Sequence, residues 1–192
     1  WINDLHQYTN NAPLAVHFHN DMGMALENTL QAVRAGVSMV SGTFLGIGER
    51  AGNVALEQVL NGLRVRFGIE VKGINYDAIV HVCEFLEQLG VGPVPPYSKA
   101  AQRSQSGIHV NSVLYDPLSY IVFPHSELEV WFGKNSGASN FKYLFEKQVL
   151  QPQSQERYEK MRSVIKSLAI EQERSFTSQE ILDLLEQGVF DE

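Results

Sequence analysis

The strongest constraint on the fold is the order of apolar runs and amphipathic segments in the first third of the chain. Residues 14–19 form a short apolar run that ends in His-Phe-His, and residues 37–44 form a second one. Over residues 22–35 and 54–67, apolar side chains recur every three or four positions, as they do on one face of a helix. This order of strand, helix, strand and helix predicts parallel β/α units with right-handed crossovers. The loops after the strands then lie where α/β folds bind ligands.

Two β/α units can neither close a barrel nor cover a sheet. We therefore expect the missing partner strands to lie upstream or on another chain. The chain opens on Trp1 without an initiator methionine, so it reads as a chain entered midway. A proteolytic piece, an engineered piece and the product of a split gene are all compatible with this start.

His17 and His19 are the first candidate site. Alternate side chains of a strand point to the same face, so the two imidazoles would lie on one side with Cα atoms roughly 7 Å apart. That spacing suits two nitrogen ligands of one divalent ion. Asn20 and Asp21 follow directly, where they could orient the imidazoles, and we expect Asp21 to cap the next helix. The alternative is a pair of packing histidines. The pair alone is an incomplete site, and an oxygen ligand should come from elsewhere.

The glycine-rich loop at residues 46–53 is the second candidate. Its spacing, G-x-G-x-x-x-G, misses the dinucleotide fingerprint by one residue, so we reject that function. We expect its glycines to allow a sharp turn that brings Glu49, Arg50 and Asn53 to the top of the preceding strand. The Asn53 amide oxygen suits a hard cation, and Arg50 could pair with Glu49 or with a carboxylate ligand. The alternative is a tight loop with a surface ion pair.

The pattern changes beyond residue 68. Residues 76–89 should form a helix, and the proline cluster at 91–97 should be a hinge before a second, smaller module. The predicted modules are residues 1–74, 75–150 and 151–192. In the helix predicted over residues 76–89, five side chains are expected to face inward: Ile79, Val82, Cys83, Leu86 and Leu89.

The second module contains one further histidine of interest. His109 follows a Ser-Gly pair and is flanked by small residues, which favours an exposed, functional histidine over a capping one. Residues 133–137, Gly-Lys-Asn-Ser-Gly, resemble a phosphate loop only superficially, because position 128 is leucine, and we expect a helix N-cap instead. An edge strand is predicted at 127–132. Helices are predicted at 138–150, 156–170 and 178–187.

Composition limits the class of protein. The chain has 192 residues, 44% of them hydrophobic, which is typical of a globular, core-forming protein. A net charge of -7 argues against nucleic-acid binding. No apolar run reaches the roughly 18–20 residues of a membrane span, so we expect no membrane partner. The single cysteine, Cys83, cannot form an internal disulfide, in keeping with a reducing compartment and a cytoplasmic location.

Four motifs together resemble a known family. They are H-x-H-N-D from residue 17, G-x-G-E-R-A-G-N from residue 46, S-G-I-H ending at His109, and the G-K-N-S-G stretch. This combination resembles the acyl-CoA-dependent 2-oxo-acid condensing enzymes, that is, isopropylmalate, homocitrate and citramalate synthases, which are relatives of hydroxymethylglutaryl-CoA lyase. The resemblance covers residues 14–150. It implies an α/β chain that contains the last two β/α units of a TIM barrel, followed by small, mainly helical C-terminal subdomains.

The resemblance also implies roles for individual residues. His17 and His19 would be metal ligands, and Asn53 would lie at or beside the metal. His109 would reach the barrel of a partner subunit, in a homodimer that exchanges subdomains, and would take part in acid/base chemistry with Tyr120. We also expect Glu49 to act in catalysis and Arg50 to bind substrate.

The implied reaction is a metal-dependent condensation of acetyl-CoA, or another acyl-CoA, with a 2-oxo acid, with zinc, manganese or magnesium as the ion. The aspartate ligand of the first barrel strand is absent from this chain, as are its arginine and glutamate neighbours, so the chain alone should be inactive. The segment 97–106 also lacks a phenylalanine and a histidine often found before S-G-I-H. The motifs lean towards a homocitrate or citramalate type, with an isopropylmalate type open. A noncatalytic assembly or regulatory subunit and a lyase running the reverse cleavage are the alternatives.

Overall fold

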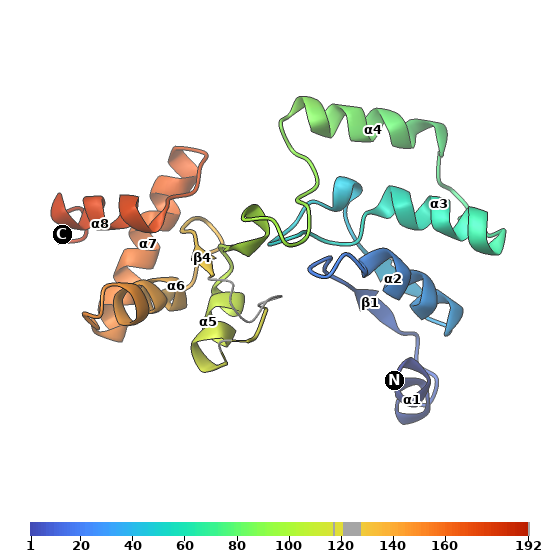
Figure 1. The fold of residues 1–192 in the computed structure, drawn as a ribbon, viewed down its shortest axis with the longest axis horizontal. Helices are drawn as coiled ribbons and strands as arrows, with labels where there is room; N and C mark the ends of the chain where they lie inside the picture. The colour runs from blue at the N-terminus through green and yellow to red at the C-terminus, as the bar shows by residue number, and fades with distance from the viewer. Residues whose placement is uncertain (117, 121–127, 192) are drawn as a thin grey trace. The chain divides into compact units, whose positions relative to one another are not determined.

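The computed structural model describes residues 1–116, 118–120 and 128–191, which form two compact units (Figure 1). The first unit is Trp1–Ala101 and the second is Gln102–Glu192. Each unit has a hydrophobic core of its own. The predicted module boundaries after residues 74 and 150 stay predictions. Within the described ranges, none of the helices combines the length and the apolar composition that a bilayer crossing needs.

The first unit is built on two parallel strands, as the sequence predicts. The strands β1 (Ala15–His17) and β2 (Met39–Ser41) pair with Val16 opposite Val40 and His17 opposite Ser41. The other elements are α1 (Ile2–Tyr8), α2 (Ala25–Arg34), a 3-10 turn η1 (Phe44–Gly46), α3 (Leu56–Phe67) and α4 (Asp77–Gln88). The β/α order is therefore confirmed, although both strands are shorter than the apolar runs that predicted them.

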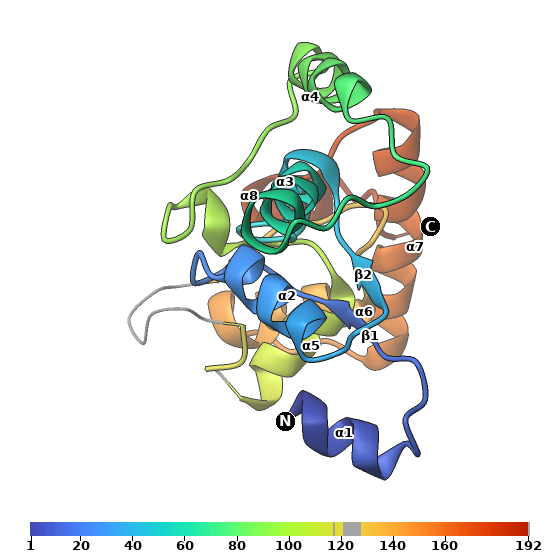
Figure 2. The ribbon, with the colours of Figure 1, turned by 90° about the vertical axis from the view of Figure 1, so that its right-hand side faces the viewer.

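The two faces of this small sheet have different surroundings. The helices α2 and α3 lie side by side (Figures 1 and 2), and their buried residues Leu30, Val59 and Leu63 form a core against which Val40 packs. On the opposite face, Met39 is 65% exposed and His17 is also exposed. Because alternate strand residues point to opposite faces, the imidazole of His17 lies on the face that the helices leave open.

The predicted start of α2 is wrong. The helix begins at Ala25, three residues later than expected, because residues 21–23 turn through Gly23, whose φ is +72°. Asp21 does not cap it. The backbone N–H of Ala25 instead donates to Oδ1 of Asn20 at 3.2 Å, which leaves the Asp21 carboxylate to another partner, described below.

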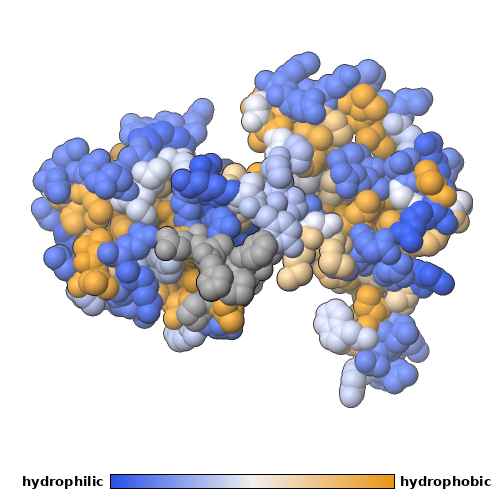
Figure 3. All heavy atoms as spheres, viewed as in Figure 1, coloured by the Kyte–Doolittle hydropathy of each residue, from blue (hydrophilic) through white to orange (hydrophobic). Residues whose placement is uncertain are grey.

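The predicted burial of α4 is also wrong. No residue of the helix is buried. Val82 and Leu89, expected to face inward, are 38% and 62% exposed, whereas Ile79, Cys83 and Leu86 are half-buried. Apolar atoms therefore reach the surface over α4 (Figure 3). Helical periodicity predicts which side chains share a face, but it does not show whether another element covers that face.

The second unit combines a minimal sheet with helices. The strands β3 (Arg103–Ser104) and β4 (Glu129–Val130) are parallel, and the helices are α5 (Gly107–Tyr115), α6 (Ala138–Tyr143), α7 (Gln155–Glu171) and α8 (Ser178–Glu186). One core joins them, with fully buried aromatic rings at Phe132, Phe141, Phe145, Tyr158, Phe176 and Phe190. The tail after residue 150 therefore shares its core with the residues before it.

Two predicted elements of this unit are shorter than expected. The helix predicted over 138–150 changes at Leu144 into one π-helical turn, η3 (Leu144–Gln148). The strand predicted over 127–132 is limited to β4, and its first residue, Glu127, lies outside the described residues. The predicted helix start at Gly137 is confirmed, because the N–H of Gly137 donates to Oδ1 of Asn140 at 3.0 Å.

A capping box begins α8. The N–H of Thr177 donates to Oε2 of Glu180 at 2.8 Å, and the N–H of Glu180 donates to the hydroxyl of Thr177 at 3.3 Å. The backbone N–H of Thr177, followed by the side chain of Arg174, lowers the pKa of Glu180 below its ordinary value of 4.5. The carboxylate therefore stabilises the fold above about pH 4.5, and this contribution is lost as the pH falls through the lowered pKa.

We predict that Glu180→Gln lowers the free energy of unfolding at pH 7 by about 0.5 kcal/mol, because glutamine keeps the capping-box hydrogen bond and loses only the charge that pairs with Arg174. The difference from the unsubstituted chain should be smaller at pH 3 than at pH 7, because the stabilisation by the carboxylate is lost as the pH falls through the lowered pKa of Glu180. Urea unfolding at the two pH values measures this. Glu186→Gln, at the other end of α8, is the control and should lower stability at neither pH. An equal loss at pH 3 and pH 7 would contradict the prediction.

Candidate metal centre

The rings of His17 and His19 lie together at the end of β1. Their centroids are 5.1 Å apart, and the ring planes meet at 85°. Two imidazoles that bind one ion at nitrogen distances of 2.0–2.1 Å place their centroids about 4.5–5.5 Å apart. The spacing of the two rings thus fits a pair of ligands that share one divalent ion.

Ser41 orients the first of these rings. It lies opposite His17 in the parallel register, and its Oγ is 3.2 Å from Nδ1 of His17. A hydrogen bond at Nδ1 leaves Nε2 to face a ligand, which is the usual way in which a neighbour orients a metal-binding imidazole. Sequence reasoning did not single out Ser41, because strand register cannot be read from one sequence.

Asn53 completes the group from the glycine-rich loop. It forms a single antiparallel bridge with His19, and its Nδ2 donates to the carbonyl oxygen of Ile47 at 2.9 Å. This bond fixes the amide so that its other atom, Oδ1, is buried, and within the described residues that oxygen has no hydrogen-bond partner. A buried acceptor without a partner calls for an explanation, and a cation is one.

The donor set is two imidazoles and one amide oxygen. No three His, Cys, Asp or Glu side chains gather within reach of one ion in the described part of the chain. The set suits a borderline divalent metal, since imidazole nitrogen favours zinc and its neighbours while the amide oxygen accepts harder ions. The residues present therefore fit part of a metal site, and further ligands would have to come from beyond this donor set.

Close backbone approach explains the spacing of the loop glycines. A Cβ atom on Gly48 would lie 2.6 Å from Nδ2 of Asn53. A Cβ atom on Gly52, where φ is +81°, would lie 1.9 Å from the carbonyl oxygen of Gly46. That oxygen accepts the N–H of Asn53 at 2.9 Å. The glycines therefore allow the loop to fold tightly around Asn53, which the predicted sharp turn anticipated.

Arg50 forms an ion pair with Asp21 across the two loops. Its Nε and Nη2 donate to the two carboxylate oxygens of Asp21 at 3.0 and 2.8 Å, and the Arg50 side chain is only 2% exposed. The backbone of Arg50 is left-handed, with φ at +59°. The predicted catalytic role of Glu49, which is half-buried in the same loop, and substrate binding by Arg50 stay predictions.

The proline-rich segment predicted to be a hinge belongs to the first unit. Pro93 and Val94 line a small hollow of about 60 Å³, together with Asn20 and Asn53. At least part of this segment thus lies beside the loop that carries Asn53.

His109 and Tyr120 lie together in the second unit. Their ring centroids are 4.5 Å apart at an interplanar angle of 40°. His109 lies in the first turns of α5 and is half-buried, whereas the sequence suggested an exposed side chain. His17 and His19 belong to the first unit, whereas His109 and Tyr120 belong to the second.

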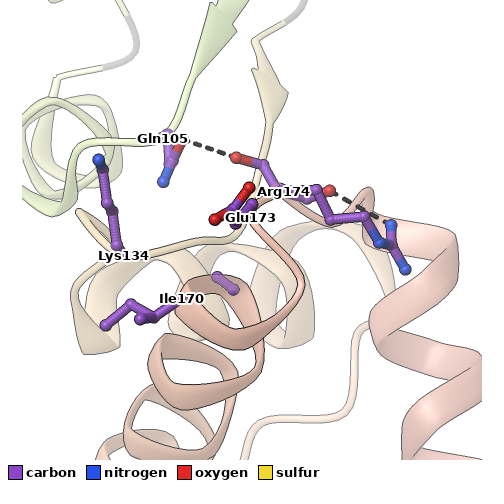
Figure 4. Close-up of a pocket in the computed structure, with 7 residues that line it drawn as sticks. Gln105, Lys134, Ile170, Glu173 and Arg174 are labelled. Carbon is purple, nitrogen blue, oxygen red and sulfur yellow. Dashed lines mark hydrogen bonds between the residues drawn. The ribbon is translucent and has the colours of Figure 1, made fainter.

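The second unit also has an open pocket of about 370 Å³ (Figure 4). Lys134 and Glu173 give its wall opposite charges, and Ser175 donates to Oε1 of Gln105 at 3.0 Å. The remaining lining residues are Ala169, Ile170 and Arg174. None of the predicted site residues lines this pocket. The G-K-N-S-G stretch thus contributes Lys134 to a pocket wall and Gly137 to a helix start.

We predict that Gly52→Ala destabilises the first unit by more than Gly68→Ala. Both glycines have positive φ, but a Cβ on Gly68 would have no neighbour within 4 Å. Gly68→Ala should therefore cost only the left-handed penalty of roughly 1–2 kcal/mol, whereas Gly52→Ala adds a clash with the backbone. Urea unfolding measures both. Equal losses in the two variants would show that the tight approach of Gly52 to Gly46 is absent.

Comparison with known proteins identifies the family. Residues 1–86 match the HMGL-like family model. The chain is 32% identical over 185 residues to homocitrate synthase 1 of Nostoc sp., covering 91% of this chain and 48% of that protein. It is 38% identical over 149 residues to 2-isopropylmalate synthase of Pyrococcus furiosus, covering 71% of this chain and 30% of the relative.

A third relative is homocitrate synthase AksA of Methanopyrus kandleri, at 38% identity over 133 residues, which are 65% of this chain and 33% of that protein. The chain thus spans half the length or less of these curated relatives. The matches confirm the resemblance drawn from the four motifs. Residues 1–86 therefore belong to the HMGL-like family, and the chain is a relative of the homocitrate and 2-isopropylmalate synthases.

Proposed function

We propose that this chain is part of a divalent-metal-dependent enzyme that condenses an acyl-CoA with a 2-oxo acid, and that His17, His19 and Asn53 hold the ion. The observation that carries the proposal is the buried Oδ1 of Asn53, which has no partner in the described residues and lies on the loop bridged to His19. The curated relatives support the direction of reaction, because they are synthases rather than lyases.

Within this site each residue has a separate task. His17 would bind through Nε2, with Nδ1 occupied by Ser41, and Asn53 would bind through Oδ1 while Ile47 holds its amide nitrogen. The bound ion would supply Lewis-acid polarisation of the 2-oxo carbonyl, and two imidazoles favour a borderline metal such as zinc over magnesium.

The second unit would supply proton transfer. An imidazole can take up and release a proton near neutral pH, and the Tyr120 ring packed on His109 would hold its orientation. A base removes a proton from the acyl-CoA carbon next to the thioester. That carbon then forms a bond to the ketone carbon, the ketone oxygen takes up a proton, and water cleaves the thioester to release CoA. We propose His109 for this proton traffic, with Glu49 as a second participant and Arg50 as a further contact to the substrate.

The fold supports the need for further strands. Parallel sheets in α/β proteins are normally covered on both faces, whereas the face of β1 and β2 that carries His17 is open. We propose that residues 1–74 are the last quarter of a TIM barrel, and that other strands supply a carboxylate ligand and the pocket for the oxo acid. Residues 75–150 and 151–192 would form the subdomains that are exchanged within a homodimer.

We predict that the metal-free chain binds Zn²⁺ and that His17→Ala, His19→Ala and Asn53→Ala each weaken binding. Removal of a direct ligand should cost more than the roughly 10- to 100-fold that loss of an outer partner costs. Isothermal titration measures the affinity. His81→Ala is the control, because His81 is 80% exposed and lies on α4. Zn²⁺ affinity that is equal in the unsubstituted chain and in the His17→Ala/His19→Ala variant would contradict the proposed site.

We predict that the 192-residue chain alone releases no CoA from acetyl-CoA and a panel of 2-oxo acids, measured as free thiol. In a protein that also carries the remaining barrel strands, His109→Ala should lower the rate of CoA release by about 10²- to 10⁴-fold, the usual contribution of a general acid or base. The zinc content of the His109→Ala variant should equal that of the unsubstituted protein. CoA release by the chain alone would contradict the need for further barrel strands. Full activity of the His109→Ala variant would contradict the proposed role of His109 in proton transfer.

A further inference from the structure

The two loops that carry the proposed ligands are joined by a ladder of backbone contacts. His19 and Asn53 form the central bridge. On either side of it, the N–H of Asn20 donates to the oxygen of Gly52 at 2.9 Å, and the N–H of Val54 donates to the oxygen of Phe18 at 3.0 Å. The separation between the two ligands therefore depends on how firmly these two loops are held together.

The ion pair of Asp21 and Arg50 spans the same two loops. Asp21 lies two residues after His19, and Arg50 lies three residues before Asn53. Two parallel hydrogen bonds join the guanidinium to both carboxylate oxygens, which fixes their orientation as well as their distance. The pair thus adds a side-chain connection to the backbone ladder.

Arg50 occupies this place at a conformational cost. Its φ of +59° is in the left-handed region, which a residue with a Cβ atom rarely adopts. Its side chain is nevertheless almost completely buried, with Asp21 as the counter-charge. A buried, bidentate pair in a strained loop beside the ligands suggests a positional role that an ordinary surface ion pair would not have.

We propose that Asp21 and Arg50 are a positioning pair, which sets the separation of His19 and Asn53 and thereby the affinity of the site for its divalent ion. Neither residue acts as a ligand in this proposal. The inference rests on the proposed metal site and goes beyond it by naming what holds that site in shape.

The test uses the 192-residue chain and Zn²⁺ as the probe. Arg50→Lys keeps the positive charge but removes the planar fork. Asp21→Asn keeps the shape of the partner but removes its charge, and it serves as the second variant if Arg50→Lys does not fold. Arg66→Lys is the matched control, because Arg66 forms an exposed ion pair with Glu27 between α3 and α2 of the same unit.

Two measurements are made on each variant. The first is Zn²⁺ affinity by isothermal titration. The second is hydrogen exchange of the backbone amides of Asn20, Asn53 and Val54 in the metal-free chain, relative to the α3 amides of Leu60 and Leu63. The exchange measurement reports the loops alone and does not depend on metal binding.

We expect Arg50→Lys and Asp21→Asn to weaken Zn²⁺ binding by about 10- to 100-fold, as loss of an outer partner of a metal site does, and to speed exchange at the three loop amides but not in α3. Arg66→Lys should change neither the Zn²⁺ affinity nor the exchange of the loop amides. Unchanged affinity or unchanged loop exchange in the pair variants would overturn the inference while the metal site stands. If the unsubstituted chain bound no Zn²⁺, the metal site itself would fail and the inference with it.

Discussion

The bridge between His19 and Asn53 is the contact on which the rest of the first unit depends. It joins the end of the first strand to the loop that follows the second strand. A histidine and an amide that are far apart in sequence can serve one ion only if these two segments are aligned to within a fraction of an ångström. The core of Leu30, Val59 and Leu63 places the two helices, and the glycines of the loop then permit the final close approach.

Much of this arrangement follows from the sequence. The alternation of strand residues places His17 and His19 together, and the ring spacing agrees with it. The β/α order predicts parallel pairing, which the register of β1 and β2 shows. These predictions rest on the pattern of neighbouring residues, which can be read from a single sequence. The same holds for the helix start at Gly137, where only the residues of the first turn are involved.

Several features that sequence reasoning missed are nonlocal. Ser41 meets His17 only because of strand register, and Asp21 meets Arg50 across 29 positions of the chain. Asp21 is a residue type that often caps helices, and it lies just before α2 in the sequence. Its carboxylate instead pairs with Arg50, and Oδ1 of Asn20 accepts the N–H of Ala25. Periodicity also predicts a buried apolar face on α4, whereas no residue of the helix is buried, because periodicity contains no information about the covering element.

His17 and Asn53 are held in place in different ways, because one face of the sheet in the first unit is uncovered. The open face of β1 and β2 carries His17, so the imidazole is held by Ser41 and by the neighbouring ring rather than by surrounding core. Asn53, by contrast, is held by its own loop, with the amide nitrogen fixed and the oxygen buried. The amide oxygen is therefore fixed by its own loop, whereas the exposed imidazole of His17 has more freedom on the open side. Strands that cover this face would restrict the imidazoles and exclude water, and both effects strengthen the binding of a divalent ion.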